Sequence, residues 1–139
     1  MIAEEYLQLN EERLEYNFYC FHGEVKFCNV IRFDNIQTKD SVEAAYTPNW
    51  EYLDFHLPSY HFAKEIEKPE NLEEMLRVSE QISRDFLFGR VDFMVYQDRT
   101  MLGELTFSPA SGFDRTFTDE ALNIMGSWLD LSKSKHYKG

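Results

Sequence analysis

The sequence predicts an α+β fold in which an antiparallel sheet, built from two hairpins, carries two helices on one face. Two pairs of aromatic and β-branched runs, each pair interrupted by a short turn, predict the hairpins. Two segments with apolar residues at helical spacing predict the helices. The 139 residues have the length of one domain, 1–139, and 43% hydrophobic residues supply its core.

The first hairpin is expected from residues 15–22 (EYNFYCFH) and 24–32 (EVKFCNVIR), which Gly23 separates. Residues 33–62 mix polar and aromatic side chains without a clear period. We expect loops there, with one short strand near residues 50–55.

The first helix is expected after Pro69, where Asn71 can cap and Glu74 follows three residues later. The residues that recur at helical spacing and are expected to face the core are Leu72, Met75, Leu76, Ser79, Ile82 and Phe86. The second hairpin is expected from residues 90–96 and 101–107.

The last helix is expected to follow Thr118. Residues 132–139 (SKSKHYKG) form a polar tail, which we expect to be disordered. The residues of this helix that should face the core are Ala121, Leu122, Met125, Trp128 and Leu129.

The formal net charge of −11 argues against nucleic-acid binding, because an acidic chain gains nothing from counterion release. No apolar run approaches the roughly 20 residues that cross a bilayer, and the acidic start MIAEEYLQLNEE differs from a signal peptide. We therefore expect a cytoplasmic protein without membrane insertion. Cys20 and Cys28 lie in strand-like runs, which indicates reduced core thiols, and with His22 they do not match zinc-ligand spacing.

Two carboxylates fall on the second hairpin. If Gln97 to Arg99 form a three-residue loop, Asp92 lies opposite Glu104 and both point to one face of the sheet. Like charges in that arrangement destabilise a sheet, and a divalent cation reverses the effect.

Asp92, Glu104 and the Thr106 hydroxyl are thus candidate magnesium ligands, and Arg90 on the same face is placed to neutralise a phosphate. Two other interpretations stay open. One places the carboxylates on a solvated face, and the other pairs them with Arg90 and Arg99. A one-residue change in turn register would send them to opposite faces.

Three ordered stretches resemble the end of the ATP-grasp fold, in particular the TupA-like ATP-grasp family: RVDFM, then GELTFSPASGF, then FTDEALNIMGSWLDL. Upstream, EYNFYCFHGEVKF is similar to that family's strand-turn-strand, KPENLEEMLRVSEQIS to its helix, and IAEEYL to the segment that opens the second ATP-binding subdomain. The resemblance covers nearly the whole chain and implies the C-terminal half of an ATP-grasp fold.

The resemblance also implies site residues, because ATP-grasp enzymes bind two magnesium ions and ATP through an Arg-x-Asp strand and a Glu-x-Asn strand. Asp92 and Glu104 match the metal ligands, Arg90 matches the catalytic phosphate contact, and Thr106 stands where relatives have Asn. The Ser108–Gly112 loop would line the acceptor side. The remaining nucleotide contacts that it implies are Glu4, Glu5 and Leu7 at adenine, Glu15 at the ribose and Arg32 at a phosphate.

The function implied is ATP-dependent carboxylate–amine ligation in teichuronopeptide or capsular polysaccharide synthesis, with ATP, magnesium and an acidic polysaccharide or amino-acid acceptor. ATP-grasp enzymes add phosphate-binding lysines and a glycine-rich lid from a first subdomain, for which this chain shows no equivalent motif. We therefore expect a partner, either an N-terminal ATP-grasp half or a second copy. The alternative is a non-catalytic subdomain used in assembly or weak nucleotide binding, which family association would label a polysaccharide glycosyltransferase.

Overall fold

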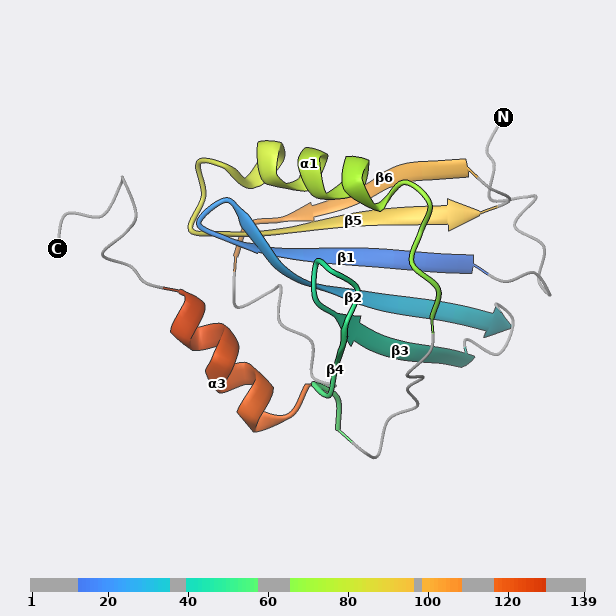
Figure 1. The fold of residues 1–139 in the computed structure, drawn as a ribbon, viewed down its shortest axis with the longest axis horizontal. Helices are drawn as coiled ribbons and strands as arrows, with labels where there is room; N and C mark the ends of the chain where they lie inside the picture. Colours follow the sequence, from blue (N-terminus) through green and yellow to red (C-terminus); the bar gives the residue numbers. More distant parts are fainter. Residues whose placement is uncertain (1–12, 36–39, 58–65, 97–98, 109–116, 130–139) are drawn as a thin grey trace, which may run out of the picture.

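A computed structural model describes residues 13–35, 40–57, 66–96, 99–108 and 117–129 of the chain (Figure 1). These residues form a six-stranded antiparallel sheet in the order β4-β3-β2-β1-β5-β6, with two helices, α1 and α3. The elements are β1 (Arg13–Phe21), β2 (Glu24–Asn35), β3 (Asp40–Tyr46), β4 (Tyr52–Leu53), α1 (Leu72–Ser83), β5 (Phe88–Tyr96), β6 (Arg99–Thr106) and α3 (Asp119–Trp128). The α+β class is therefore confirmed.

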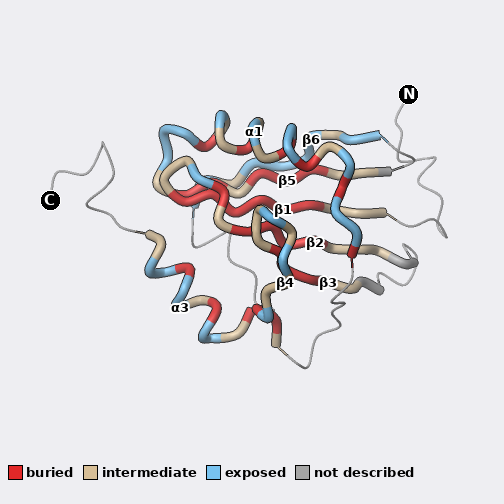
Figure 2. The backbone as a smooth tube through the Cα atoms, in the orientation of Figure 1, coloured by how far each residue is buried: buried red, intermediate tan, exposed pale blue. Residues whose placement is uncertain are grey.

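Both predicted hairpins are present, and they join into one sheet because β1 pairs with β5 as well as with β2. His22 and Gly23 turn the first hairpin with φ angles of 55° and 80°. Glycine suits this turn because a Cβ on Gly23 would also lie 3.1 Å from the Arg84 Cα. β1 is consequently a central strand, and its residues from Tyr16 to Phe21 are all buried (Figure 2).

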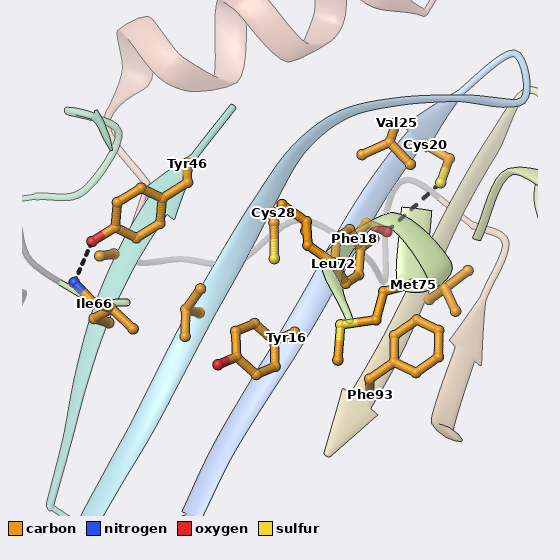
Figure 3. Packing of buried hydrophobic residues seen from close by; sticks show 13 residues of the cluster. Tyr16, Phe18, Cys20, Val25, Cys28, Tyr46, Ile66, Leu72, Met75 and Phe93 are labelled. Atoms are coloured by element: carbon orange, nitrogen blue, oxygen red, sulfur yellow. Dashed lines mark hydrogen bonds between the residues drawn. The ribbon is translucent and has the colours of Figure 1, made fainter. Parts of the chain in front are cut away.

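Strand β3 was not predicted, because its residues DSVEAAY lack a strong β pattern. β3 pairs with β2, with Ala45 opposite Asn29. These contacts stabilise the strand although its local β propensity is weak. β4 falls within the short strand expected at residues 50–55. The segment before α1 contacts β3 through Ile66, whose N–H donates a 2.7 Å hydrogen bond to the Tyr46 hydroxyl (Figure 3).

The two helices pack on opposite faces of the sheet, so the prediction of two helices on one face is wrong. Alternate β1 side chains enter two separate cores. Phe18 lies in a core with Leu72 and Met75 of α1 (Figure 3). Tyr19 and Phe21 lie in the other core with residues of α3. We call these two sides of the sheet the α1 face and the α3 face.

An aromatic cluster holds α3 against its face. The Phe27 ring stacks on Tyr19 at 4.4 Å between centroids and lies 6.2 Å from the Trp128 ring. Phe117, just before α3, lies 5.8 Å from Phe27. The predicted start of α3 is confirmed, because the Thr118 hydroxyl accepts a hydrogen bond from the Ala121 N–H.

Helix α1 begins and ends close to its predicted position, with two differences. Asn71 is the residue before the helix but its side chain makes no capping bond, and its Nδ2 instead donates to the Thr100 hydroxyl at 3.2 Å. Phe86 lies beyond the helix and is exposed rather than in the apolar stripe. The expected tail at 132–139 lies outside the described residues. No helix in the described ranges is long and apolar enough to span a membrane.

Candidate functional site

Half of the α3 face is polar. The aromatic cluster covers the end of the sheet near the β1–β2 turn, and polar side chains occupy the strands beyond it. Asn29 of β2, Asn17 of β1 and Asp92 of β5 lie side by side in one row across the sheet. All three are buried. Buried amides and a carboxylate in a sheet need partners, so this row is the candidate site.

The β5–β6 hairpin has a shorter turn than predicted. Tyr96 pairs with Arg99, so two residues rather than three connect the strands, and the predicted pairing next to the turn is wrong by one residue. A β-bulge then places Gly103 and Glu104 opposite Asp92. Beyond the bulge, Arg90 pairs with Thr106, which is the register that the three-residue loop predicted.

Arg90 lies between the two carboxylates. Its Nε and Nη2 donate to the two Asp92 carboxylate oxygens at 3.0 and 2.9 Å, and Nη2 lies 3.6 Å from Glu104 Oε1. Asp92 and Glu104 thus share one face, as predicted. Of the interpretations left open by the sequence, pairing with Arg90 holds. Asp92 is 3% exposed, whereas the Glu104 side chain is 71% exposed.

Burial raises the pKa of Asp92 above its ordinary value of 3.8, even though the hydrogen bonds and charge of Arg90 lower it. A hydrogen bond with Asn17 also lowers this pKa, and the charge of Glu104 raises it. Burial lowers the pKa of Arg90, but the hydrogen bonds and charges of Asp92 and Tyr19 together raise this pKa above its ordinary value. The charged state of the buried Asp92 carboxylate therefore depends on its pairing with Arg90.

Glu15 belongs to the same polar half. Burial raises its pKa, the charge of Asp92 raises it further, and the charges of Arg13 and Arg90 lower it. Asn17 hydrogen bonds with Glu15 as well as with Asp92. Three carboxylates and two guanidinium groups thus influence one another on this surface.

The family model described as TupA-like ATPgrasp matches residues 1–130. The chain belongs to the TupA-like ATP-grasp family. Searches of curated proteins and of solved structures returned no match. Membership in an ATP-grasp family implies ATP binding.

The donor set suits a cation that ATP itself helps to hold. Within the described ranges no group of three or more His, Cys, Asp or Glu side chains is placed to bind a metal. Magnesium in nucleotide sites, however, commonly takes one or two carboxylates and completes its shell with phosphates and water. Asp92 and Glu104 supply that number of carboxylates.

The structure separates one predicted ATP-grasp site residue from the others. Arg32 follows Val30 and Cys28 in alternation and lies on the α1 face, where it lines a groove with Leu14 and Tyr16. It therefore does not share a site with Arg90 or Asp92. Glu4, Glu5 and Leu7 lie outside the described residues, as does the Ser108–Gly112 loop after Ser108.

Sequence reasoning missed the asparagines and a second polar group on the ATP-grasp sheet. The Asn29 Nδ2 donates to Glu43 Oε1 at 3.1 Å, and His56 Nε2 lies 3.5 Å from the same oxygen. Asn17 and Asn29 each interrupt an aromatic or β-branched run, which is the signal that was available in the sequence. His56 carried no such signal because it lies in polar sequence.

Proposed function

We propose that this ATP-grasp chain binds the triphosphate of ATP through magnesium held by Asp92 and Glu104. The observation that carries the proposal is the convergence of both carboxylates and Arg90 on one polar face of the sheet. The raised pKa of Asp92 supports it, because a divalent cation stabilises the ionised carboxylate that burial disfavours.

Each neighbouring residue has a role in this proposal. Arg90 would be the catalytic phosphate contact, and bound magnesium would supply the positive charge that Arg90 now gives to the two carboxylates. Thr106, which pairs with Arg90 across the strands, adds a hydroxyl oxygen beside the cation. Glu15 lies within the electrostatic reach of Asp92 and binds the ribose hydroxyls.

The reaction we propose is carboxylate–amine ligation in cell-surface polysaccharide synthesis of the teichuronopeptide or capsule type. Magnesium held by Asp92 and Glu104 would offset the triphosphate charge. An acceptor carboxylate would attack the terminal phosphorus and release ADP, and an amine would then displace phosphate from the resulting acylphosphate to form the amide. The acceptor is an acidic polysaccharide or an amino acid. The phosphate-binding lysines and glycine-rich lid that the family resemblance implies would come from an N-terminal ATP-grasp half.

A non-catalytic role is the second candidate. The Arg90 bridge itself favours it, because a guanidinium that already satisfies both carboxylates makes a stable site without any metal. In that case the chain would serve assembly and bind nucleotide weakly.

Thermal unfolding with and without magnesium and ATP distinguishes the two candidates. At ligand concentrations about tenfold above Kd, binding stabilises a fold by about 1.4 kcal/mol. We expect a rise in melting temperature of roughly 3–6 °C for a domain of this size. Asp92→Asn should abolish the rise, because an amide is a far weaker magnesium ligand.

Glu74→Gln is the matched control. Glu74 is also a carboxylate paired with an arginine, at 3.8 Å from Arg77, but it lies exposed on α1. Its variant should keep the full ligand-induced rise. A wild-type melting curve that millimolar magnesium and ATP leave unchanged would instead support the non-catalytic role.

A further inference from the structure

Strand β6 forms one end of the sheet, and its outer edge pairs with no other described strand. None of its eight residues is buried (Figure 2). An edge of this length offers a row of unpaired backbone N–H and C=O groups to any strand that can match it.

Apolar side chains gather along this edge on the α1 face. Leu102 and Leu105 are 51% and 43% exposed and pair with Phe93 and Val91, both of the α1-face core. Phe107 stacks on Phe86 at 4.1 Å between centroids, and both rings are exposed. A groove of about 180 Å³ separates Leu102 from α1. The edge is therefore apolar on the α1 face from Leu102 to Phe107.

The bulge limits which strand can match this edge. Residues directly opposite in an antiparallel pair point to the same face. Thr100 and Leu102 point to the α1 face before the bulge, whereas Leu105 does so after it, so the alternation changes phase at Gly103 and Glu104. A regular strand therefore matches only half of β6.

A second copy of β6 matches both halves. Consider two antiparallel copies of β6 related by a two-fold axis that passes between residues 103 and 104. The bulge of one copy then lies opposite the bulge of the other, so that Gly103 and Glu104 of each copy face the same two residues of its partner. Leu102 then lies opposite Leu105 of the second copy, and Thr100 opposite Phe107. Glu104 lies opposite Gly103, so the two carboxylates are not directly opposed.

Charge permits this approach in an otherwise acidic chain. The formal net charge is −11, yet β6 contains one arginine and one glutamate, Arg99 and Glu104, and is neutral. Glu104 is further compensated by Arg90 at 3.6 Å. The neutral, apolar edge is thus a surface on which two copies do not repel each other strongly.

We infer that two copies of this chain associate through antiparallel β6–β6 pairing centred between Gly103 and Glu104. The pairing joins two six-stranded sheets into one and buries the apolar edge of each copy. The β6–β6 pairing follows from the geometry of this edge and does not depend on ATP binding. It would place the two Asp92–Glu104 pairs on either side of the two-fold axis.

Cysteine cross-linking tests the register. Leu102→Cys and Leu105→Cys are made as separate variants, mixed and oxidised. Paired residues with Cα atoms 4.5 to 5.5 Å apart lie within disulfide range, so we expect a cross-linked dimer in the mixture and little in either variant alone. The native thiols Cys20 and Cys28 are buried and should not compete. Equal cross-linking in each single variant would overturn the register.

Sedimentation over a concentration series tests the association itself. We expect a wild-type dimer, and Leu105→Glu should raise its Kd roughly tenfold or more, because each symmetric interface contains the substitution twice. Ile124→Glu, at an exposed apolar residue of α3, is the control and should leave the Kd unchanged. A wild type that stays a single copy at every concentration, or a control that dissociates equally, would overturn the inference. A shared melting temperature of the dilute variants checks that both fold.

Discussion

Replacing Arg90 by alanine is expected to lower the free energy of unfolding by about 3–5 kcal/mol at pH 7. Asp92 is 3% exposed and would lose both of its guanidinium hydrogen bonds, at 3.0 and 2.9 Å. An ionised carboxylate buried without a partner costs several kcal/mol. Urea denaturation of the variant and the wild type measures the difference.

The loss of stability caused by Arg90→Ala should depend on pH. Burial already holds the pKa of Asp92 above 3.8, and loss of Arg90 removes two causes that lower it. Because the folded pKa exceeds the unfolded one, the stability contribution of this group is complete below the unfolded pKa and is lost as pH rises through the folded pKa. The deficit of Arg90→Ala should therefore be small near pH 4 and largest at pH 7.

The double variant Arg90→Ala with Asp92→Asn is the control, because it removes the buried charge together with its partner. It should recover more than half of the lost stability at pH 7 and show little added dependence on pH. A single variant that is equally unstable at pH 4 and pH 7 would contradict the role given to Arg90.

The separate variant Phe27→Ala is expected to lower the free energy of unfolding by about 3–5 kcal/mol, because it leaves a cavity in the aromatic cluster. Phe27 is fully buried and contacts rings from four parts of the chain. Those rings are Tyr19, Phe55, Phe117 and Trp128. Because Phe117 and Trp128 belong to the α3 region, we expect α3 to loosen together with the loss of global stability.

Trp128 fluorescence in a Trp50→Phe background reports on α3, and urea denaturation reports on global stability. Phe86→Ala is the matched control, since this phenylalanine is 44% exposed and should cost about 1 kcal/mol or less. Comparable losses at Phe27 and Phe86 would contradict the assignment of the core to the α3 face.

The sequence predicted the elements whose pattern is local. The hairpins and both helices follow from alternation, helical spacing and the Thr118 cap, which short windows of sequence contain. β3 was missed because its two alanines become strand residues only by pairing with β2. The side of the sheet that α3 covers depends on long-range packing of Phe27 and Tyr19, which no short window encodes.

The sequence predicted that the charged residues of the candidate site share one face of the sheet. Asp92, Glu104 and Arg90 converge as expected, although the turn is one residue shorter and a bulge restores the register. A bulge cannot be inferred from alternation alone, because it breaks the period on which the inference rests. Arg32 lies on the α1 face because the bulge between Tyr19 and Cys20 in the β1–β2 pairing sets the side to which its side chain points.

The proposed ATP binding requires a single cation shared by Asp92 and Glu104. Manganese in place of magnesium, followed by NMR line broadening of glycine amides, tests this most directly. We expect sub-stoichiometric Mn²⁺ with ATP to broaden Gly103, beside Glu104, well before Gly126 in α3, and Asp92→Asn to remove the selectivity. Equal broadening of the two glycines, or selective broadening around the acidic first turn of α1 at Glu73 and Glu74, would contradict it.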